Sequence, residues 1–368
     1  MNRSAHHKLN AGRKYALAGV YNLGVRVLIL LSVVLCQSGV SNAAWHSDWR
    51  GHAQLLHGVS EDALSTGRAD NVHLYVETAL SNESSRLFAA VDIGHYRYTP
   101  EQSGIEVKEA YWSWLGENAD LSIGRQIIPW GKADGLTVTD RISPKDLRQW
   151  LGMEYQDTRL GVDAVKFRYL RDQSTVELIW LPLPRFDALP SHPDNPLSEL
   201  YRPLRRRIDR ATYTLRYPTG DKPNSIKDSE WAIRQSFYGS VMDVSLSAFR
   251  GWDRQVLRYP QRNSNEIIMQ PHYHRITQFG VDVAIPEGER VWRGEVAYLP
   301  DRGFIDRHDT ATEREQWLAL AGVDWQLSGS WMITAQYFVN SVANAEALAR
   351  DGTESALTLS LDKKLLRE

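Results

Sequence analysis

The sequence predicts an all-β fold, an antiparallel transmembrane β-barrel that crosses the membrane with its strands. Three observations predict it. Polar and apolar residues alternate along most of the chain with the two-residue period of a β-strand. Short turns alternate with long polar loops from one candidate strand to the next. Amphipathic spacing typical of helices is almost absent.

The bulk composition agrees with a large folded domain. The chain has 368 residues, of which 42% are hydrophobic, with 13 Trp and 16 Tyr. It is too apolar and aromatic to be disordered. The formal net charge of −2 does not suggest a general nucleic-acid binder, so no nucleic-acid partner is expected.

Residues 1–43 have the three-part pattern of a secretory signal. A basic start without acidic residues is followed by the apolar run Val27–Cys36 and by small residues before a cut at Ala44. The apolar run is too short to span a membrane as a helix. We therefore expect residues 1–43 to be a signal peptide and residues 44–368 to form the barrel domain. The only cysteine, Cys36, lies in the signal, so no disulfide is expected in the exported part.

About fourteen segments form the predicted wall, and most are near the length of a tilted membrane strand. In order, they are Ser47–His57, Asn71–Leu80, Ser85–Tyr98, Ile105–Leu115, Leu121–Ile128, Gly161–Leu170, Ser174–Leu181, Ser229–Gly239, Val241–Gly251, His272–Ala284, Arg290–Leu299, Glu315–Leu327, Ser330–Val339 and Ser355–Leu366.

The connections between these segments sort by length. Even-numbered segments end in short turns such as Gly116–Asp120, whereas odd-numbered segments mostly end in longer polar stretches such as Pro129–Leu160 and Pro182–Asp228. Turns at one edge and loops at the other are the plan of a bacterial outer-membrane barrel. The chain ends at Glu368 without the aromatic residue that usually finishes such barrels. This ending predicts a truncated member of a larger barrel, of about 16–18 strands.

Charged residues occur in the middle of several predicted strands. Arg234, Arg293 and Glu295 alternate with apolar and aromatic neighbours. A charge that faces lipid at mid-strand costs about 2–4 kcal/mol. We therefore expect these three side chains to line a wet or plugged lumen.

The strand Leu121–Ile128 does not follow this pattern, because Arg125 shares a face with Leu121 and Ile123. Either a bulge shifts the register, or the apolar residues face a plug inside the barrel. Arg125 is counted among the predicted pore-lining residues.

The loop Pro129–Leu160 is the first candidate for a functional site. Its charges include Lys132, Asp134, Asp140 and Asp146. If the loop folds into the pore, these charges form a constriction that selects solutes. The three carboxylates could instead bind calcium, although their spacing matches no EF-hand. A loop braced by its own salt bridges, with Asp140 and Asp146 capping turns, is the third interpretation.

The loop Pro182–Asp228 contains a basic cluster with Arg205, Arg206 and Arg207 at its centre. Arginine binds carboxylates and phosphates through two parallel hydrogen bonds. The cluster would attract an anionic solute if it folds inward. We favour the alternative, an outer loop that binds lipopolysaccharide phosphates or is simply solvated.

Several motifs carry a family resemblance. They are Gly124-Arg125-Gln126, Trp130-Gly131, Ser143-Pro144-Lys145-Asp146, and the later segments Ile179–Phe186 and Ser247–Asp253. With them the chain resembles a large group of bacterial outer-membrane barrels of unassigned function, similar in architecture to alginate-export channels and porins. The resemblance implies a barrel with a transport role and implies no catalytic residue.

The sequence therefore predicts a porin-like channel or export component in the bacterial outer membrane, which passes small or anionic solutes through a charged lumen. The expected partners are outer-membrane lipid and lipopolysaccharide, a small-molecule or polyanionic solute, and components of an export system. No cofactor, metal site or enzymatic activity is expected, since hydrolase motifs such as Gly-x-Ser-x-Gly are absent. The alternative is an outer-membrane or secreted β-rich hydrolase. A structural barrel without an open lumen is a third class.

Overall fold

A computed structural model describes residues 45–58, 69–96, 103–131, 136, 138–148, 158–190, 214–216, 218, 220–263, 265–327, 330–348 and 350–363. The chain divides into two units, residues 1–45 and 46–368, and every described strand belongs to the second. The predicted signal peptide lies outside the described residues. Within the described ranges, no helix is long and apolar enough to cross a membrane.

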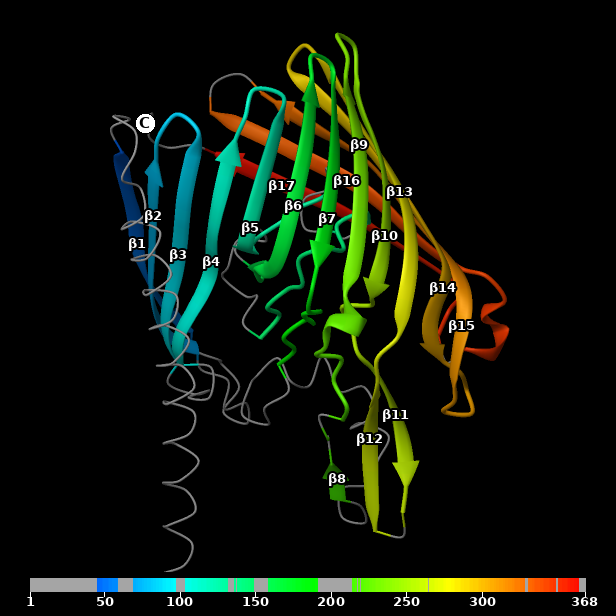
Figure 1. Cartoon of the computed structure of the whole chain (residues 1–368). Coiled ribbons are helices and arrows are strands. Elements are labelled where there is room, and N and C mark those ends of the chain that lie inside the picture. The colour runs from blue at the N-terminus through cyan, green and yellow to red at the C-terminus, as the bar shows by residue number, and fades with distance from the viewer. Residues whose placement is uncertain are drawn as a thin grey trace, which may run out of the picture. The chain divides into compact units, whose positions relative to one another are not determined.

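Fourteen strands form one antiparallel sheet in which neighbours in the sequence are neighbours in space (Figure 1). They are β1 (His46–Gly58), β2 (Ala69–Ser81), β3 (Ser85–Tyr96), β4 (Gly104–Leu115), β5 (Ala119–Gln126), β6 (Val162–Arg171), β7 (Ser174–Leu181), β9 (Glu230–Tyr238), β10 (Asp243–Trp252), β13 (Arg275–Glu287), β14 (Arg290–Ile305), β15 (Ala311–Gln326), β16 (Trp331–Val342) and β17 (Thr353–Lys363). Each of the fourteen predicted segments contains a strand of this sheet, and residues 97–98 and 364–366, at the ends of two segments, lie outside the described residues.

A second, three-stranded sheet was not predicted. It contains β8 (Thr214–Arg216), β11 (Leu257–Arg262) and β12 (Glu266–His272), which come from two of the predicted loops. β11 and β12 form an antiparallel hairpin, and β8 pairs in parallel with β12. Pro260 and Pro271 lie in these strands and make the stretch look like a loop, because proline is a poor residue for the interior of a sheet.

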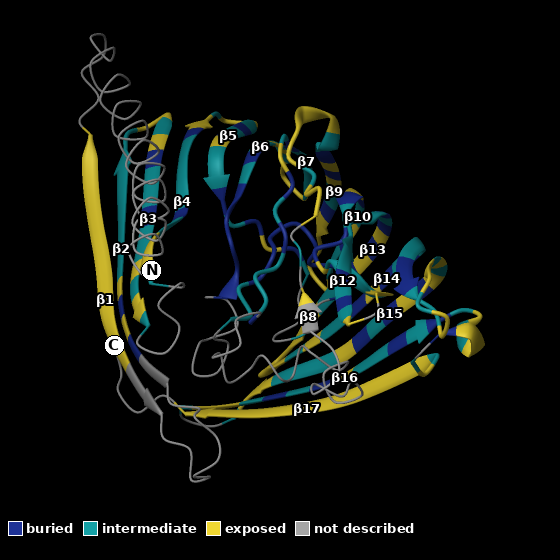
Figure 2. Ribbon diagram, turned by 90° about the horizontal axis from the view of Figure 1, so that it is seen from below, coloured by how far each residue is buried: buried dark blue, intermediate teal, exposed yellow. Residues whose placement is uncertain are grey.

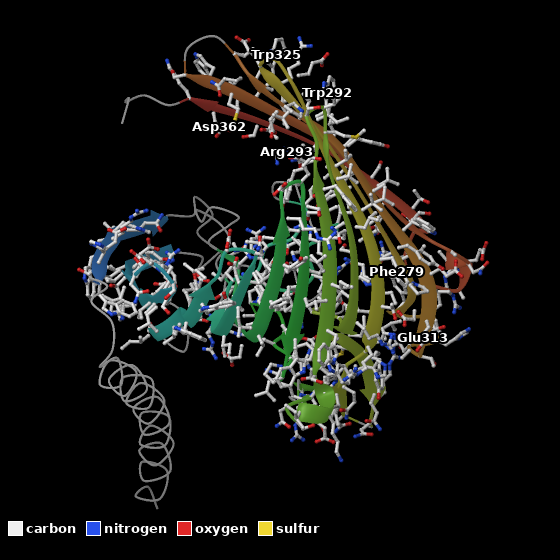
Figure 3. The ribbon with its side chains drawn as sticks, turned by 45° about the horizontal axis from the view of Figure 1, so that its top comes forward. Phe279, Trp292, Arg293, Glu313, Trp325 and Asp362 are labelled. Atoms are coloured by element: carbon white, nitrogen blue, oxygen red, sulfur yellow. The ribbon has the colours of Figure 1, made fainter. Side chains whose placement is uncertain are left out.

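The two faces of the large sheet differ in chemistry. Large apolar side chains are exposed on the outer face, among them Trp231, Phe279 and Trp317, whereas Asp282 and Glu295 are buried on the inner face. The alternation follows from the strand geometry. Figure 3 shows Trp292 and Arg293, neighbours in the sequence, on opposite sides of β14.

Aromatic residues frame the apolar outer band. On β15, Trp317 lies toward the loop edge and Trp325 toward the turn edge, and both are exposed. Trp231 and Phe237 are placed in the same way on β9. An apolar band between two aromatic rows is typical of strands that stand in a bilayer.

The sequence predicts that Arg125 lines the pore, but Arg125 lies on the outer face of the large sheet. The pairing of β5 with β4 and with β6 shows no shift in register, so Arg125 shares the outer face with Ile123. Its guanidinium donates two hydrogen bonds, of 2.9 and 3.1 Å, to Asp163, which lies directly opposite on β6. The sequence offered a bulge or an internal plug, and both explanations are wrong for β5. An ion pair near the end of the strand accommodates the charge instead.

Candidate functional site

The connection between β5 and β6 supplies the candidate site. We call residues 127–148 the inner segment; residues 127–131, 136 and 138–148 of it are described. Pro129 cannot donate a strand hydrogen bond, so the strand ends shortly before it. The segment then turns onto the concave side of the sheet, which Figure 2 shows curving around buried residues from β1 to β17.

Apolar side chains fix the inner segment to the sheet. Ile128, Trp130, Val138 and Ile142 are almost completely buried. They belong to one core with inward-facing residues of seven strands, from β6 to β15: Val162, Ala164, Ile179, Leu181, Ala232, Phe249, Ile276, Ala297, Leu299, Leu318 and Leu320. The inner face is therefore apolar where the segment packs and polar elsewhere.

Carboxylates of the sheet receive hydrogen bonds from the segment. The backbone N–H of Ile127 donates to Glu109 at 2.8 Å, and Trp130 Nε1 donates to Glu177 at 2.7 Å. The N–H and the hydroxyl of Thr139 both donate to Glu295 Oε2, at 3.1 and 2.9 Å. Three charged groups of the wall thus fasten one chain segment.

Asp140 braces the segment from within. Its Oδ1 accepts a hydrogen bond from the N–H of Trp130, and its Oδ2 accepts two from the Arg159 guanidinium at 2.9 and 3.1 Å. Asp140 is buried, and both of its oxygens have protein partners. This contact set fits the structural interpretation of Asp140. No group of His, Cys, Asp and Glu suited to a metal ion occurs among the described residues.

A buried charge network lies behind the segment. Arg254 donates to both oxygens of Glu230, at 2.9 Å each, and to the carbonyl oxygen of Arg141 at 2.8 Å. Arg141 donates to Gln278 at 3.1 Å, and Arg302 donates to Asp253 at 2.9 Å. Burial, together with the nearby Arg302, lowers the pKa of Arg141 to about 10. Burial acts to raise the pKa of Asp253, but Arg302 and Arg141 outweigh it and hold that pKa below its usual value.

The end of the segment docks against the loop that follows β7. Lys145 donates its backbone N–H to Asp187 at 2.8 Å, and Asp146 forms a parallel bridge with Ala188. Burial lowers the pKa of the Lys145 ammonium to about 8, although Asp140 and Asp187 favour its charged form. Burial also raises the pKa of Asp187.

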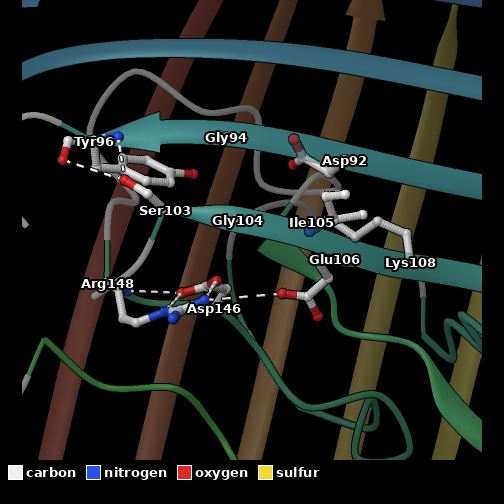
Figure 4. Close-up of a pocket in the computed structure, with 10 residues that line it drawn as sticks. All are labelled: Asp92, Gly94, Tyr96, Ser103, Gly104, Ile105, Glu106, Lys108, Asp146 and Arg148. Carbon is white, nitrogen blue, oxygen red and sulfur yellow. Dashed lines mark hydrogen bonds and ion pairs between the residues drawn. The ribbon is translucent and has the colours of Figure 1, made fainter. Parts of the chain in front are cut away.

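A pocket of about 140 Å³ separates this end of the segment from β3 and β4. Asp92, Glu106 and Lys108 line it from the strands, and Asp146 and Arg148 from the segment (Figure 4). Arg148 donates to Asp146 at 2.5 and 2.8 Å and lies 3.9 Å from Glu106. Charges of both signs thus face one another across a narrow space.

The structure places some of the predicted pore-lining residues at the lumen and one on the outer face, and it does not describe the others. Asp140, Asp146 and Glu295 come together at the inner segment. Arg234 and Arg293 lie on the inner face, where they bind Asp282 at 3.0 Å and Asp324 at 2.6 Å. Arg125 faces outward. Lys132, Asp134, Arg205, Arg206 and Arg207 lie outside the described residues.

Sequence reasoning missed three polar contributors to the site: Arg254, Gln278 and Arg302. Gln278 donates to the carbonyl oxygen of Thr139 at 3.0 Å and accepts from Arg141, so it joins the segment to β13. The alternation of residues along β13 predicts that Gln278 points inward, and this was the sequence signal that could have identified it. Nothing local distinguished Arg254 or Arg302 from other loop-side arginines.

Comparisons with known proteins identify the fold. No model of a known protein family matches the sequence. No curated protein matches it. Solved structures do match: OmpT, an outer membrane protein of Vibrio cholerae, superimposes with a TM-score of 0.50 at 9% identity, over 89% of this chain and 84% of that one. A variant of that protein lacking loop L8 gives a TM-score of 0.51 at 9% identity, over 88% and 90% of the two chains.

The chain has the fold of bacterial outer-membrane β-barrel proteins. At 9% identity this likeness concerns the fold and not the activity. The resemblance to a particular family of such barrels stays a prediction, because no family model matches.

Proposed function

We propose that the protein stands in the bacterial outer membrane and acts as a porin-like channel for small solutes. The observation that carries this proposal is the inner segment, which is fastened across the concave face of a sheet whose outer face is apolar. Such an arrangement suits a lumen that is narrowed at a fixed level. The apolar outer band with its aromatic rows supports the membrane location.

In this proposal the solute passes along the side of the lumen that faces away from the apolar contacts of the inner segment. Those contacts involve β6 to β15 and, through the partly buried Phe338, also β16, so β1 to β4 and β17 border the remaining space. The pocket between Asp146, Arg148 and β3–β4 lies on this side. Its mixed charges suit small polar solutes, whose hydration shell they can replace in part.

The test is single-channel conductance of the purified protein in a planar bilayer, with reversal potentials in a salt gradient. Steady unitary conductance is the expected result. Folded, membrane-inserted protein that conducts nothing would contradict the proposal. The reversal potential reports which sign of charge dominates the path.

A hydrolase is the second candidate, and one observation favours it. Asp92, Glu106 and Asp146 share the pocket, and His73 Nδ1 lies 3.3 Å from Asp92 Oδ1 and 3.4 Å from the Tyr96 hydroxyl. A histidine beside a carboxylate can act as a general base. Hydrolysis of ester or peptide probes that disappears in His73→Ala, with conductance retained, would establish this activity.

A further inference from the structure

The pocket between the inner segment and strands β3 and β4 contains two like charges in facing positions. Asp92 of β3 and Glu106 of β4 are direct partners in the strand register, and both line the pocket (Figure 4). Two carboxylates that face each other on neighbouring strands repel, which disfavours the pairing. A positively charged group bound between them would relieve this repulsion. The facing carboxylates therefore suit a ligand that carries a cation.

Each of these two carboxylates keeps one oxygen that is not fully engaged. Asp92 Oδ1 lies 3.3 Å from His73 Nδ1, and Asp92 Oδ2 accepts no hydrogen bond within the described ranges. Glu106 Oε1 accepts a hydrogen bond from Arg185 at 2.5 Å, whereas Glu106 Oε2 is 3.9 Å from Arg148 Nη2. An ammonium group has three N–H donors and no acceptor. One oxygen from each strand is therefore available to such a group.

A β-bulge brings a positive charge to the same pocket. Ala90 pairs with Glu109, and Val91 pairs with Val107. Lys108 is thus the extra residue of β4, and the register shifts at this point. Lys108 lines the pocket while Glu109 accepts a hydrogen bond from the inner segment, so two consecutive residues face inward. A bulge can aim a side chain at a site in this way, and here it places an ammonium group beside the two carboxylates.

We propose that this pocket binds small zwitterions, with their ammonium group at Asp92 and Glu106 and their carboxylate on the side of Lys108. α-Amino acids belong to this class, because they carry both charges on one carbon atom. The pocket volume of about 140 Å³ has room for several water molecules and hence for a solute with few heavy atoms. The inference rests on the proposed channel function, since it names the solute class that the narrowed path selects.

Solutes with one charge meet a like charge in this pocket. A small anion lies against the facing carboxylates, and a small cation lies against Lys108 and Arg148. Arg148 donates to Asp146 at 2.5 and 2.8 Å, so its charge is held in place at the pocket. A neutral solute avoids repulsion but forms no hydrogen bond in which both partners are charged. Complementary charges at both of its ends therefore favour a zwitterion.

Four solutes of nearly equal size test the proposal on the wild-type protein. They are glycine, a zwitterion; ethanolamine, a cation; glycolate, an anion; and glycolamide, which is neutral. Uptake of each labelled solute into lipid vesicles that contain the purified protein is measured as a function of its concentration. Glycine uptake should saturate, with a half-saturation concentration about tenfold lower than that of the other three, because it forms one additional charge-assisted contact.

Substitutions in the pocket should exchange the preference. Asp92→Asn should raise the half-saturation concentration for glycine about tenfold and favour glycolate, because it removes a negative charge. Lys108→Met should also weaken glycine binding but favour ethanolamine. Asp362→Asn is the matched control on β17, which borders the same lumen, since Asp362 accepts a hydrogen bond from Ser360 of its own strand. It should leave the uptake of all four solutes unchanged. Gel mobility of the folded form confirms that each variant is intact.

The failure of this inference is distinguishable from the failure of the channel function. Equal half-saturation concentrations for the four solutes, with steady conductance, would overturn the zwitterion site and leave the channel in place. Glycine uptake that is unchanged in both Asp92→Asn and Lys108→Met would overturn it as well, because the selective site would then lie elsewhere. Folded, inserted protein that neither conducts nor passes any of the four solutes would overturn both proposals.

Discussion

At the scale of single residues, three glutamates of the sheet help to hold the inner segment in place by accepting hydrogen bonds from it. Glu109, Glu177 and Glu295 each accept a hydrogen bond from a different residue of the inner segment. A carboxylate that accepts hydrogen bonds from backbone N–H groups forms strong, charge-assisted bonds. These glutamates therefore serve as anchors for the inner segment.

Glu230→Gln should be strongly destabilising. Glu230 is fully buried and neutralises Arg254, which is itself 5% exposed at its side chain. Removing one partner of a buried ion pair costs about 3–5 kcal/mol, because the other charge is left buried. Urea unfolding in lipid vesicles measures this loss. Asp48→Asn is the matched control, since its ion pair with Arg50 is largely exposed and contributes less than about 1 kcal/mol.

Because of Lys145, the free energy of unfolding should rise with pH above about pH 8. Burial lowers the pKa of Lys145 to about 8 in the folded protein, from the ordinary value of 10.5. Between these values the unfolded chain binds more protons than the folded one, so the free energy of unfolding increases by at most about 1.4 kcal/mol per pH unit. Below pH 8 the full cost of burying the charge remains.

Lys145→Met should remove this rise. Unfolding free energies of the wild type and the variant at pH 7 and pH 10 provide the measurement. Equal pH dependence in the two proteins would show that another group titrates.

At the scale of elements, the inner segment is a fixed partition and not a mobile plug. It combines apolar packing on seven strands with hydrogen bonds to β4, β7, β13 and β14. Local opening is rare where buried contacts are dense. A channel narrowed in this way should conduct steadily.

The double variant Glu177→Ala with Glu295→Ala should release the first half of the segment. It leaves three donors of Trp130 and Thr139 without their acceptors, at a cost of about 1–3 kcal/mol each. Single-channel recordings should show larger or fluctuating conductance. Glu77→Ala is the control, because Glu77 faces the same lumen but accepts from Tyr75 of its own strand. Unchanged, steady conductance in the double variant would mean that apolar packing alone holds the segment.

At the scale of the whole molecule, the outer and inner faces of the large sheet carry different kinds of side chain. The outer face carries residues that would be buried in a water-soluble protein, and the inner face carries most of the mid-strand charges. This inversion fits a sheet with lipid outside and a polar interior.

Val296→Arg should lower the free energy of unfolding in vesicles by about 2–4 kcal/mol, because it places a charge on the lipid face near mid-strand. Thr358→Arg is the matched control on the inner face of β17, where the new guanidinium can remain hydrated. Equal destabilisation by the two variants would show that the outer face is not in lipid.

Much of the wall could be predicted from the sequence, because strand periodicity and turn length are local properties. All fourteen segments and the inward direction of Arg234, Arg293 and Glu295 follow from alternation alone. Arg125 could not be placed, because its compensation by Asp163 joins residues 38 positions apart. The hairpin of β11 and β12 was not predicted, because its prolines and its irregular pattern of polar and apolar residues are typical of a loop.

The sequence by itself determined which residues form strands, which face of each strand is apolar and which connections are long. These properties depend on neighbours one to a few residues away. Only the tertiary structure decided where the inner segment lies and which groups hold it. The contact between Thr139 and Glu295 spans 156 residues, and no local pattern encodes such a pairing. Its formation depends on the curvature of the complete sheet, which brings β14 and the end of β5 around the same interior.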